Sequence, residues 1–89
     1  MTDDLARATG ARGELERRIE NDFSYHAPFG DQAARYVDLR QFAKSFARYI
    51  IERTPPSREQ SLALTNLEQA VFWANAAIAR HEKEHQRDG

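Results

Sequence analysis

The chain has 89 residues, no cysteine and a net charge of −1 at pH 7, from 13 lysines and arginines against 14 aspartates and glutamates. This length allows one small domain, and the lack of cysteine excludes a disulfide scaffold, a cysteine nucleophile and a thiolate metal site. A nearly neutral chain lacks the basic surplus of proteins that coat nucleic acids, so no DNA or RNA polymer is expected as a partner. The acidic start is unlike a signal peptide and no apolar run suits a membrane, which predicts a cytoplasmic protein with no membrane partner.

A first, short helix is predicted from about Gly13 to Asp22, after a start over residues 1–12 that we expect to be partly disordered or frayed. The segment is highly charged, and Leu15 and Ile19 form its apolar pair at i,i+4 spacing. Such a helix is marginal by itself and has to dock through that narrow stripe.

A second helix is predicted from Asp31, as its N-cap, to about Arg53, and Pro55 ends it. Apolar residues at three- and four-residue spacing share one face of this helix: Tyr36, Leu39, Ala43, Phe46 and Ile50. Further apolar residues, such as Phe42 and Tyr49, make that face much broader than a simple stripe.

A third helix is predicted from Ser57 to about Glu84, with a frayed tail over residues 83–89. Ser57 and Gln60 have the spacing of a capping box, in which each side chain satisfies a free amide of the other residue. Residues 54–56 join the second helix to the third, and so short a link requires an antiparallel hairpin. Apolar residues at helical spacing form the face toward the second helix: Leu64, Leu67, Val71, Ala74 and Ile78.

The predicted fold is all-α, because no segment alternates apolar and polar residues over more than a few positions. We expect a single domain over residues 1–89, made of a short N-terminal helix and a long antiparallel helical hairpin. The third helix also carries apolar residues on both flanks of its face, including Phe72 and Trp73. One short helix cannot cover them all, which predicts a homo-oligomer. The alternative is a monomer in which the first helix folds over the hairpin.

Residues 81–85 match the zinc-protease motif H-E-x-x-H. Histidines at i and i+4 share a helical face and can bind one Zn²⁺, with the glutamate as general base. Here His81, Glu82 and His85 lie in a charged run that is typical of a solvated helix end. We interpret the run as a charged tail, and we predict no metal, no cofactor and no catalytic residue.

Residues 23–29 concentrate aromatic side chains and a histidine beside arginines of the second helix. Aromatic faces stack nucleobases, at about 1–3 kcal/mol each, and guanidinium groups bind phosphates. A nucleotide pocket is therefore predicted from Phe23, Tyr25, His26, Tyr36 and Arg40. For Phe23 and Phe29 the alternative is that they close the end of the hairpin as core. The polar tips of Tyr25 and His26 favour binding.

Asn75 and Arg80 are further candidates, because both interrupt an alanine-rich stretch of the third helix. Asparagine has poor helix propensity, and its amide needs hydrogen-bond partners that a core does not offer. The side chain of Asn75 therefore either bonds across an oligomer seam or faces a ligand.

The same residues carry a resemblance to a known family. The sequence is similar to the small phage helical-hairpin family that includes the anti-CBASS cyclic-oligonucleotide sponge and the hairpin portion of a Thoeris anti-defence protein. The similar stretches are residues 25–28 (Tyr-His-Ala-Pro), 32–40, 56–59 (Pro-Ser-Arg-Glu) and 67–80. The last stretch is the most specific, and the resemblance extends over about residues 14–82.

The resemblance implies a non-enzymatic sponge. Members of the sponge family are homohexamers that sequester cyclic dinucleotides and, at separate sites, cyclic trinucleotides, without cleaving them. Such binding removes the signal that activates the CBASS defence, in the cytoplasm of the host that a phage infects. The alternative is a structural or protein-interaction hairpin with no nucleotide ligand.

The resemblance also implies roles for single residues. The family's dinucleotide pocket uses an aromatic and a cationic side chain, for base and phosphate, and Tyr25 and Arg40 are the closest matches. Asn75 and Arg80 match the family's C-terminal signature, which serves ligand contact or assembly. Ala27 stands in the turn where the family usually has proline, and this departure leaves open which nucleotide binds, or whether one binds.

Overall fold

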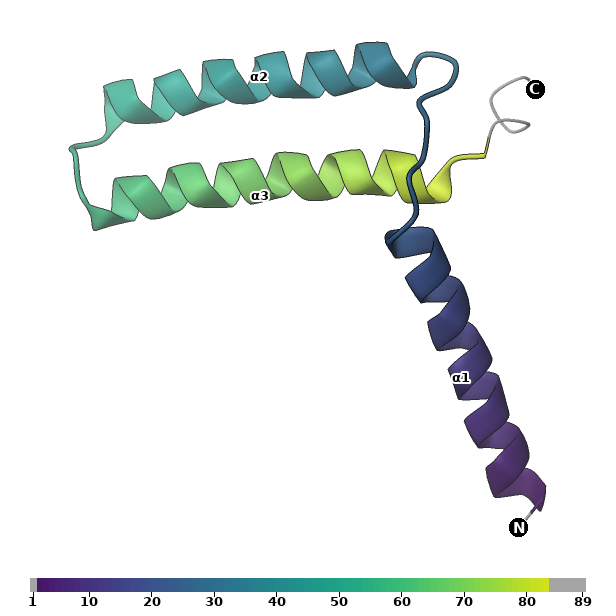
Figure 1. Cartoon of the computed structure of the whole chain (residues 1–89). Helices are drawn as coiled ribbons and strands as arrows, with labels where there is room; N and C mark the ends of the chain where they lie inside the picture. Colours follow the sequence, from purple (N-terminus) through teal and green to yellow (C-terminus); the bar gives the residue numbers. More distant parts are fainter. Residues whose placement is uncertain (1, 84–89) are drawn as a thin grey trace.

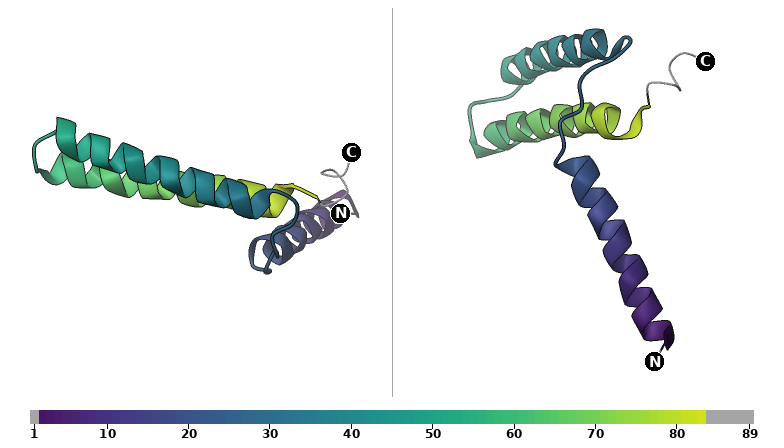
Figure 2. Two further views of the ribbon diagram at one scale, coloured as in Figure 1. Left: turned by 90° about the horizontal axis from the view of Figure 1, so that it is seen from above. Right: turned by 45° about the vertical axis from the view of Figure 1, so that its right-hand side comes forward.

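The computed structural model describes the backbone of residues 2–83 and the side chains of residues 10–83. This part of the chain forms helices α1 (Thr2–Asp22), α2 (Gln32–Arg53) and α3 (Arg58–His81), and it contains no strand. Helices α2 and α3 lie side by side as an antiparallel hairpin (Figure 1). Helix α1 meets the hairpin at the open end, opposite the turn, and points away from it (Figure 2). The predicted all-α architecture is confirmed.

Helix α1 is the element that differs most from the prediction, because it begins at Thr2 and not near Gly13. Helix α1 runs through the glycines at positions 10 and 13, each of which costs only about 1 kcal/mol inside a helix. The residues around them are mainly alanine, arginine, leucine and glutamate, which favour helix. That the first twelve residues fray stays a prediction.

The start of α2 is built differently from the expected N-cap. Asp31 does occupy the N-cap position, but its side chain makes no capping hydrogen bond. Its carboxylate instead pairs with Arg35, with 3.2 Å between Oδ1 and Nε. Before it, Gly30 adopts a positive φ of 56°, which glycine tolerates best. This turn directs the chain from the loop into α2.

The turn between α2 and α3 contains half of the predicted capping box. Ser57 Oγ accepts a hydrogen bond from the Gln60 amide at 3.1 Å, as the motif requires. The Gln60 side chain, however, donates to the carbonyl and the hydroxyl oxygen of Thr54, at 3.1 and 3.0 Å. Gln60 therefore ties the start of α3 to the end of α2, which helps to hold the hairpin closed.

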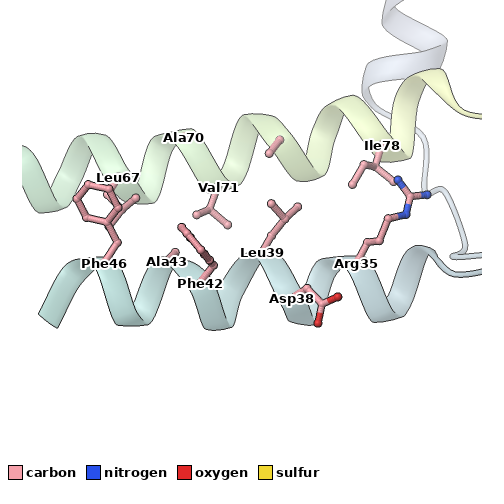
Figure 3. A pocket seen from close by; sticks show the side chains of 11 residues that line it. Arg35, Asp38, Leu39, Phe42, Ala43, Phe46, Leu67, Ala70, Val71 and Ile78 are labelled. Carbon is pink, nitrogen blue, oxygen red and sulfur yellow. The ribbon is translucent and has the colours of Figure 1, made fainter. Parts of the chain in front are cut away.

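The face between α2 and α3 follows the predicted spacing. On α3 all five predicted positions are half-buried: Leu64, Leu67, Val71, Ala74 and Ile78. On α2 the predicted positions are half-buried except Phe46, which is 48% exposed. The side chains of Leu39 and Val71 both point into the space between the helices (Figure 3). The helices thus pack through one line of contacts, with open surface on either side.

The hairpin does not enclose a core. Among the side chains of residues 10–83, no apolar one is buried, and Gln32, at 2% exposure, is the only buried side chain. The radius of gyration is 19.1 Å, whereas a compact chain of this length has about 12 Å. Leu15 and Ile19 of α1 are about half exposed, so α1 does not cover the hairpin as the monomeric alternative requires. None of the described helices is long and apolar enough to cross a bilayer.

A polar clamp, formed by Gln32, Arg35 and Glu82, closes the open end of the hairpin. Arg35 donates to both carboxylate oxygens of Glu82, at 2.8 and 2.5 Å, and Gln32 Nε2 donates to Oε1 at 3.1 Å. Gln32 Oε1 also accepts from the amide of Phe29 at 3.1 Å. The hydrogen bonds from Arg35 and Gln32 lower the pKa of Glu82 to about 2. The clamp joins the loop, α2 and the end of α3.

Glu82→Gln should therefore lower the melting temperature at pH 7. The folded pKa of Glu82 lies below its usual value of 4.5, so its carboxylate stabilises the fold above about pH 4.5 and this contribution is lost as the pH falls toward 2. Melting curves by circular dichroism should differ at pH 7 and converge at pH 2–3. Glu52→Gln, at an exposed position of α2, is the control. Equal melting temperatures at pH 7 would contradict the clamp.

Candidate functional site

A groove of about 440 Å³ lies where the end of α1, the following loop and both hairpin helices meet. Residues from all four segments line it: Asp22, Ser24, Tyr25, His26, Tyr36, Arg40, Phe72, Asn75, Ala76, Ala79 and Arg80. Nearly all the predicted binding residues are thus brought together, although they come from distant parts of the sequence. Phe23 is not in the lining, and its side chain is 85% exposed.

The loop that carries Tyr25 is held by hydrogen bonds at its base. His26 Nε2 lies 2.7 Å from the carbonyl oxygen of Asn21. A carbonyl only accepts, so this contact requires the proton on Nε2. Asn21 Nδ2 in turn donates to the carbonyl of Arg80 at 3.1 Å. These bonds connect α1, the loop and the end of α3, so His26 positions the loop as well as lining the groove.

The two arginines of the groove differ in their surroundings. The Arg80 Nε lies 3.7 Å from Asp22 Oδ1, and Arg80 also donates weakly to the Asp22 carbonyl, so its charge is largely balanced. Arg40 is exposed, and it makes no ion pair with the described residues. The groove therefore offers one guanidinium that is available to an anion, on the α2 side.

Aromatic side chains give the groove flat apolar surfaces. Tyr25 is 87% exposed at the rim, whereas Tyr36 is half-buried. Phe72, on α3, is 56% exposed and packs edge-on against Trp73, with ring centroids 5.1 Å apart. Exposed rings of this kind can stack on a planar base. The alternative role of Phe23 as a plug of the hairpin end is wrong, because the ring is exposed; Phe29 is half-buried there.

Asn75 has an unsatisfied acceptor. Its Oδ1 is buried and has no hydrogen-bond partner among the described residues. Asn75, Arg40 and Phe72 also line a neighbouring groove of about 570 Å³ that includes Lys44. A buried amide without a partner is costly, at about 1–3 kcal/mol. A ligand or a second chain supplies the missing hydrogen bond only if the Asn75 side chain turns toward the groove, and both possibilities named from the sequence remain.

Sequence reasoning missed Asp22 as a groove residue, along with the small residues of its floor. Asp22 was interpreted as the end of a charged helix, and nothing local in the sequence connects it to Arg80. Ala76 and Ala79 lie beside Asn75 and Arg80 at helical spacing, and their small side chains leave room above α3. The flank of α3 that carries Phe72 and Ala76 was the available signal.

The glutamate of the histidine motif near the end of the chain belongs to the clamp. Glu82, which would be the general base of a zinc site, accepts hydrogen bonds from Arg35 and Gln32. His81 is exposed, and His85 lies outside the described residues. The described residues contain no group of three or more potential metal ligands from histidine and acidic side chains.

Comparison with known proteins agrees with the architecture. A family model described as Acb2/Tad1, hairpin domain, matches residues 15–79, which is most of the chain. The chain belongs to this family. The match covers the hairpin, the loop before it and the last part of α1, so every residue of the groove except Arg80 lies within it.

The Acb2/Tad1 family consists of sponge-type proteins that counter the CBASS and Thoeris defences and act by binding, without catalysis. The family resemblance inferred from the sequence is confirmed. No curated protein and no solved structure gives a significant match to the chain.

Asn21→Ala should loosen the attachment of the groove loop, because it removes the hydrogen bond from Asn21 Nδ2 to Arg80. A net contribution of about 1 kcal/mol corresponds to a roughly fivefold larger open population. Chymotrypsin should then cleave after Phe23 and Tyr25 correspondingly faster. Asn66→Ala, on the exposed side of α3, should leave the rate unchanged. Equal rates for both variants would show that this bond does not hold the loop.

Proposed function

We propose that this Acb2/Tad1 hairpin protein is a non-enzymatic sponge that binds cyclic dinucleotides in the groove between α1, the loop and the hairpin. The family match supports the class of function. The single observation that supports the place is the convergence of Tyr25, Arg40, Asn75 and their neighbours on one groove. In this proposal Tyr25 stacks on a base and Arg40 binds a phosphodiester.

The charge arrangement supports this ligand class. Arg40 is exposed and unpaired within the described part of the chain, and Lys44 follows one turn later in the neighbouring groove. Two cations at i,i+4 lie on the same face of a helix. A cyclic dinucleotide carries two phosphodiester charges and two planar bases, which match cationic and aromatic surfaces. The proposal needs no metal, no cofactor and no catalytic group.

We also propose that the protein assembles with copies of itself. The accessible surface of 7559 Å² exceeds the roughly 5,400 Å² of a compact monomer of this mass. The excess, about 2,000 Å² per chain, is larger than the roughly 800 Å² that each partner buries in an interface of standard size. The exposed surface of the hairpin includes a groove of about 710 Å³, where Phe42 is 75% exposed (Figure 3). A homohexamer, as the sequence resemblance implied, would cover it.

The wider role follows from the family. By sequestering the signal in the host cytoplasm, the protein would block the CBASS defence against phage, and cyclic trinucleotides are a second ligand class at separate sites. The competing candidate is a purely structural hairpin without a nucleotide ligand. The exposed apolar faces favour it as well, because they promote association whether or not a nucleotide binds.

A thermal-shift panel of cyclic di- and trinucleotides tests the sponge. A ligand at a hundred times its Kd stabilises the native state by about 2.7 kcal/mol, which raises Tm by roughly 10 °C or more. Arg40→Ala should weaken dinucleotide binding by about 10- to 100-fold through loss of a charge-assisted contact. Arg48→Ala, two turns along α2 and outside the grooves, should bind normally. No shift with any ligand would favour the structural hairpin.

Phe42→Asp tests self-association. A carboxylate buried in an apolar interface without a partner is strongly unfavourable, so this variant should sediment as smaller species than the wild type in analytical ultracentrifugation. Gln41→Asp adds the same charge on the neighbouring position outside the groove and should keep the wild-type mass. A wild-type protein that sediments as a monomer at all concentrations would refute assembly.

A further inference from the structure

Asp22 is an unexpected residue in a groove that is proposed to bind a phosphodiester. It is the last residue of α1, and it lies on the groove together with Tyr25, Arg40 and Asn75. A carboxylate repels phosphate, and a negative charge at the C-terminal end of a helix is unfavourable for the helix. Ion pairs with Arg18 and Arg80, at 3.7 Å each, offset the unfavourable charge at the helix end, but phosphate binding gives no reason for an acid that also lines the groove.

On the basis of the proposed function, we infer that Asp22 makes the groove selective for guanine. Guanine presents two adjacent N–H donors, N1–H and the N2 amino group, on its Watson–Crick edge. A carboxylate offers two acceptor oxygens and can accept both hydrogen bonds at once. Adenine presents one amino donor beside an acceptor nitrogen, which faces a carboxylate unfavourably. Asp22 thus recognises the base, while Arg40 binds the phosphodiester.

The contacts of Asp22 leave its oxygens able to accept. Oδ1 lies 3.7 Å from Arg80 Nε and Oδ2 lies 3.7 Å from Arg18 Nε. Both distances exceed the 2.7–3.2 Å range of N–H···O hydrogen bonds, so the arginines balance the charge without using the acceptor positions. The side chain is 26% exposed, which allows contact with a ligand in the groove.

The ion pairs of Asp22 with Arg18 and Arg80 also explain how a carboxylate and an anionic ligand share one groove. Arg18 and Arg80 approach Asp22 from α1 and α3, so the local net charge is not negative. Asn75 lines the α3 side of the same groove, but its Oδ1 is buried, so the acceptors open to a base are the two oxygens of Asp22. The groove therefore combines acceptors for the donors of a base with one available cation, Arg40, for the phosphodiester.

Calorimetric titration of the full chain with cyclic diguanylate and cyclic diadenylate of the same linkage tests this inference. The ligands share rings and phosphates and differ only in the base edge. The wild type should bind the guanine ligand roughly 5- to 150-fold more tightly, as expected for one bidentate contact. Asp22→Asn should lose most of this ratio, by weaker guanine binding with adenine binding equal or stronger.

Matched variants separate recognition from folding. Glu16→Gln makes the same change of charge on an exposed position of α1 outside the groove and should keep the ratio. Arg18→Ala removes one ion pair of Asp22 and should also keep it, because the carboxylate remains. Circular-dichroism melts verify that each variant is folded.

The remaining outcomes contradict either the guanine selectivity of Asp22 or the proposed sponge function. Equal binding of both ligands by the wild type, or a ratio that survives in Asp22→Asn, ends the guanine assignment and leaves the sponge intact. A loss of both ligands to the same extent in Asp22→Asn assigns Asp22 a structural role and also ends it. If the wild type binds neither of these two ligands and no other member of the cyclic-nucleotide panel, the proposed function itself is wrong.

Discussion

The shortage of apolar contact within one chain is the constraint on which the rest of the molecule depends. Two helices can meet along only one line, so residues such as Leu67 and Val71 are half-buried and none of the described apolar side chains is fully enclosed. Hydrophobic burial is normally the main stabilising term of a fold. Here it is limited, and polar interactions at the two ends of the hairpin have to set its geometry.

Those polar interactions lie where loops enter or leave the helices. At the turn, Gln60 joins the two helices, and at the open end Arg35, Gln32 and Glu82 do so. The open-end clamp also anchors the loop before α2 through Phe29. The polar clamp, which stabilises a hairpin with little apolar burial, therefore also positions the loop that carries Tyr25. Glu82, which in the sequence suggested a metal motif, belongs to this framework.

The groove combines several weak features that none of its residues has alone. Arg40 supplies a charge without an ion pair among the described residues, Tyr25 supplies an exposed ring, and Asp22 supplies acceptor oxygens. Such a mixture of cation, aromatic ring and acceptor matches the parts of a nucleotide. Because the apolar faces of the hairpin are open as well, assembly and ligand binding involve adjacent surfaces, and Asn75 lies at the border between two grooves.

The sequence by itself determined the two hairpin helices, their antiparallel pairing and most of the groove residues, but not where α1 begins. Helical spacing, the short link at Pro55 and the family signature each lie within a short stretch of sequence. Such local features are sufficient to predict the two helices and their antiparallel pairing. Only the tertiary structure decided that α1 points away, that Glu82 closes the hairpin on Arg35, and that Asp22 faces Arg80. Arg35 and Glu82 are 47 positions apart in the sequence, and Asp22 and Arg80 are 58 positions apart. Charged side chains have no periodic pattern that reveals such distant partners.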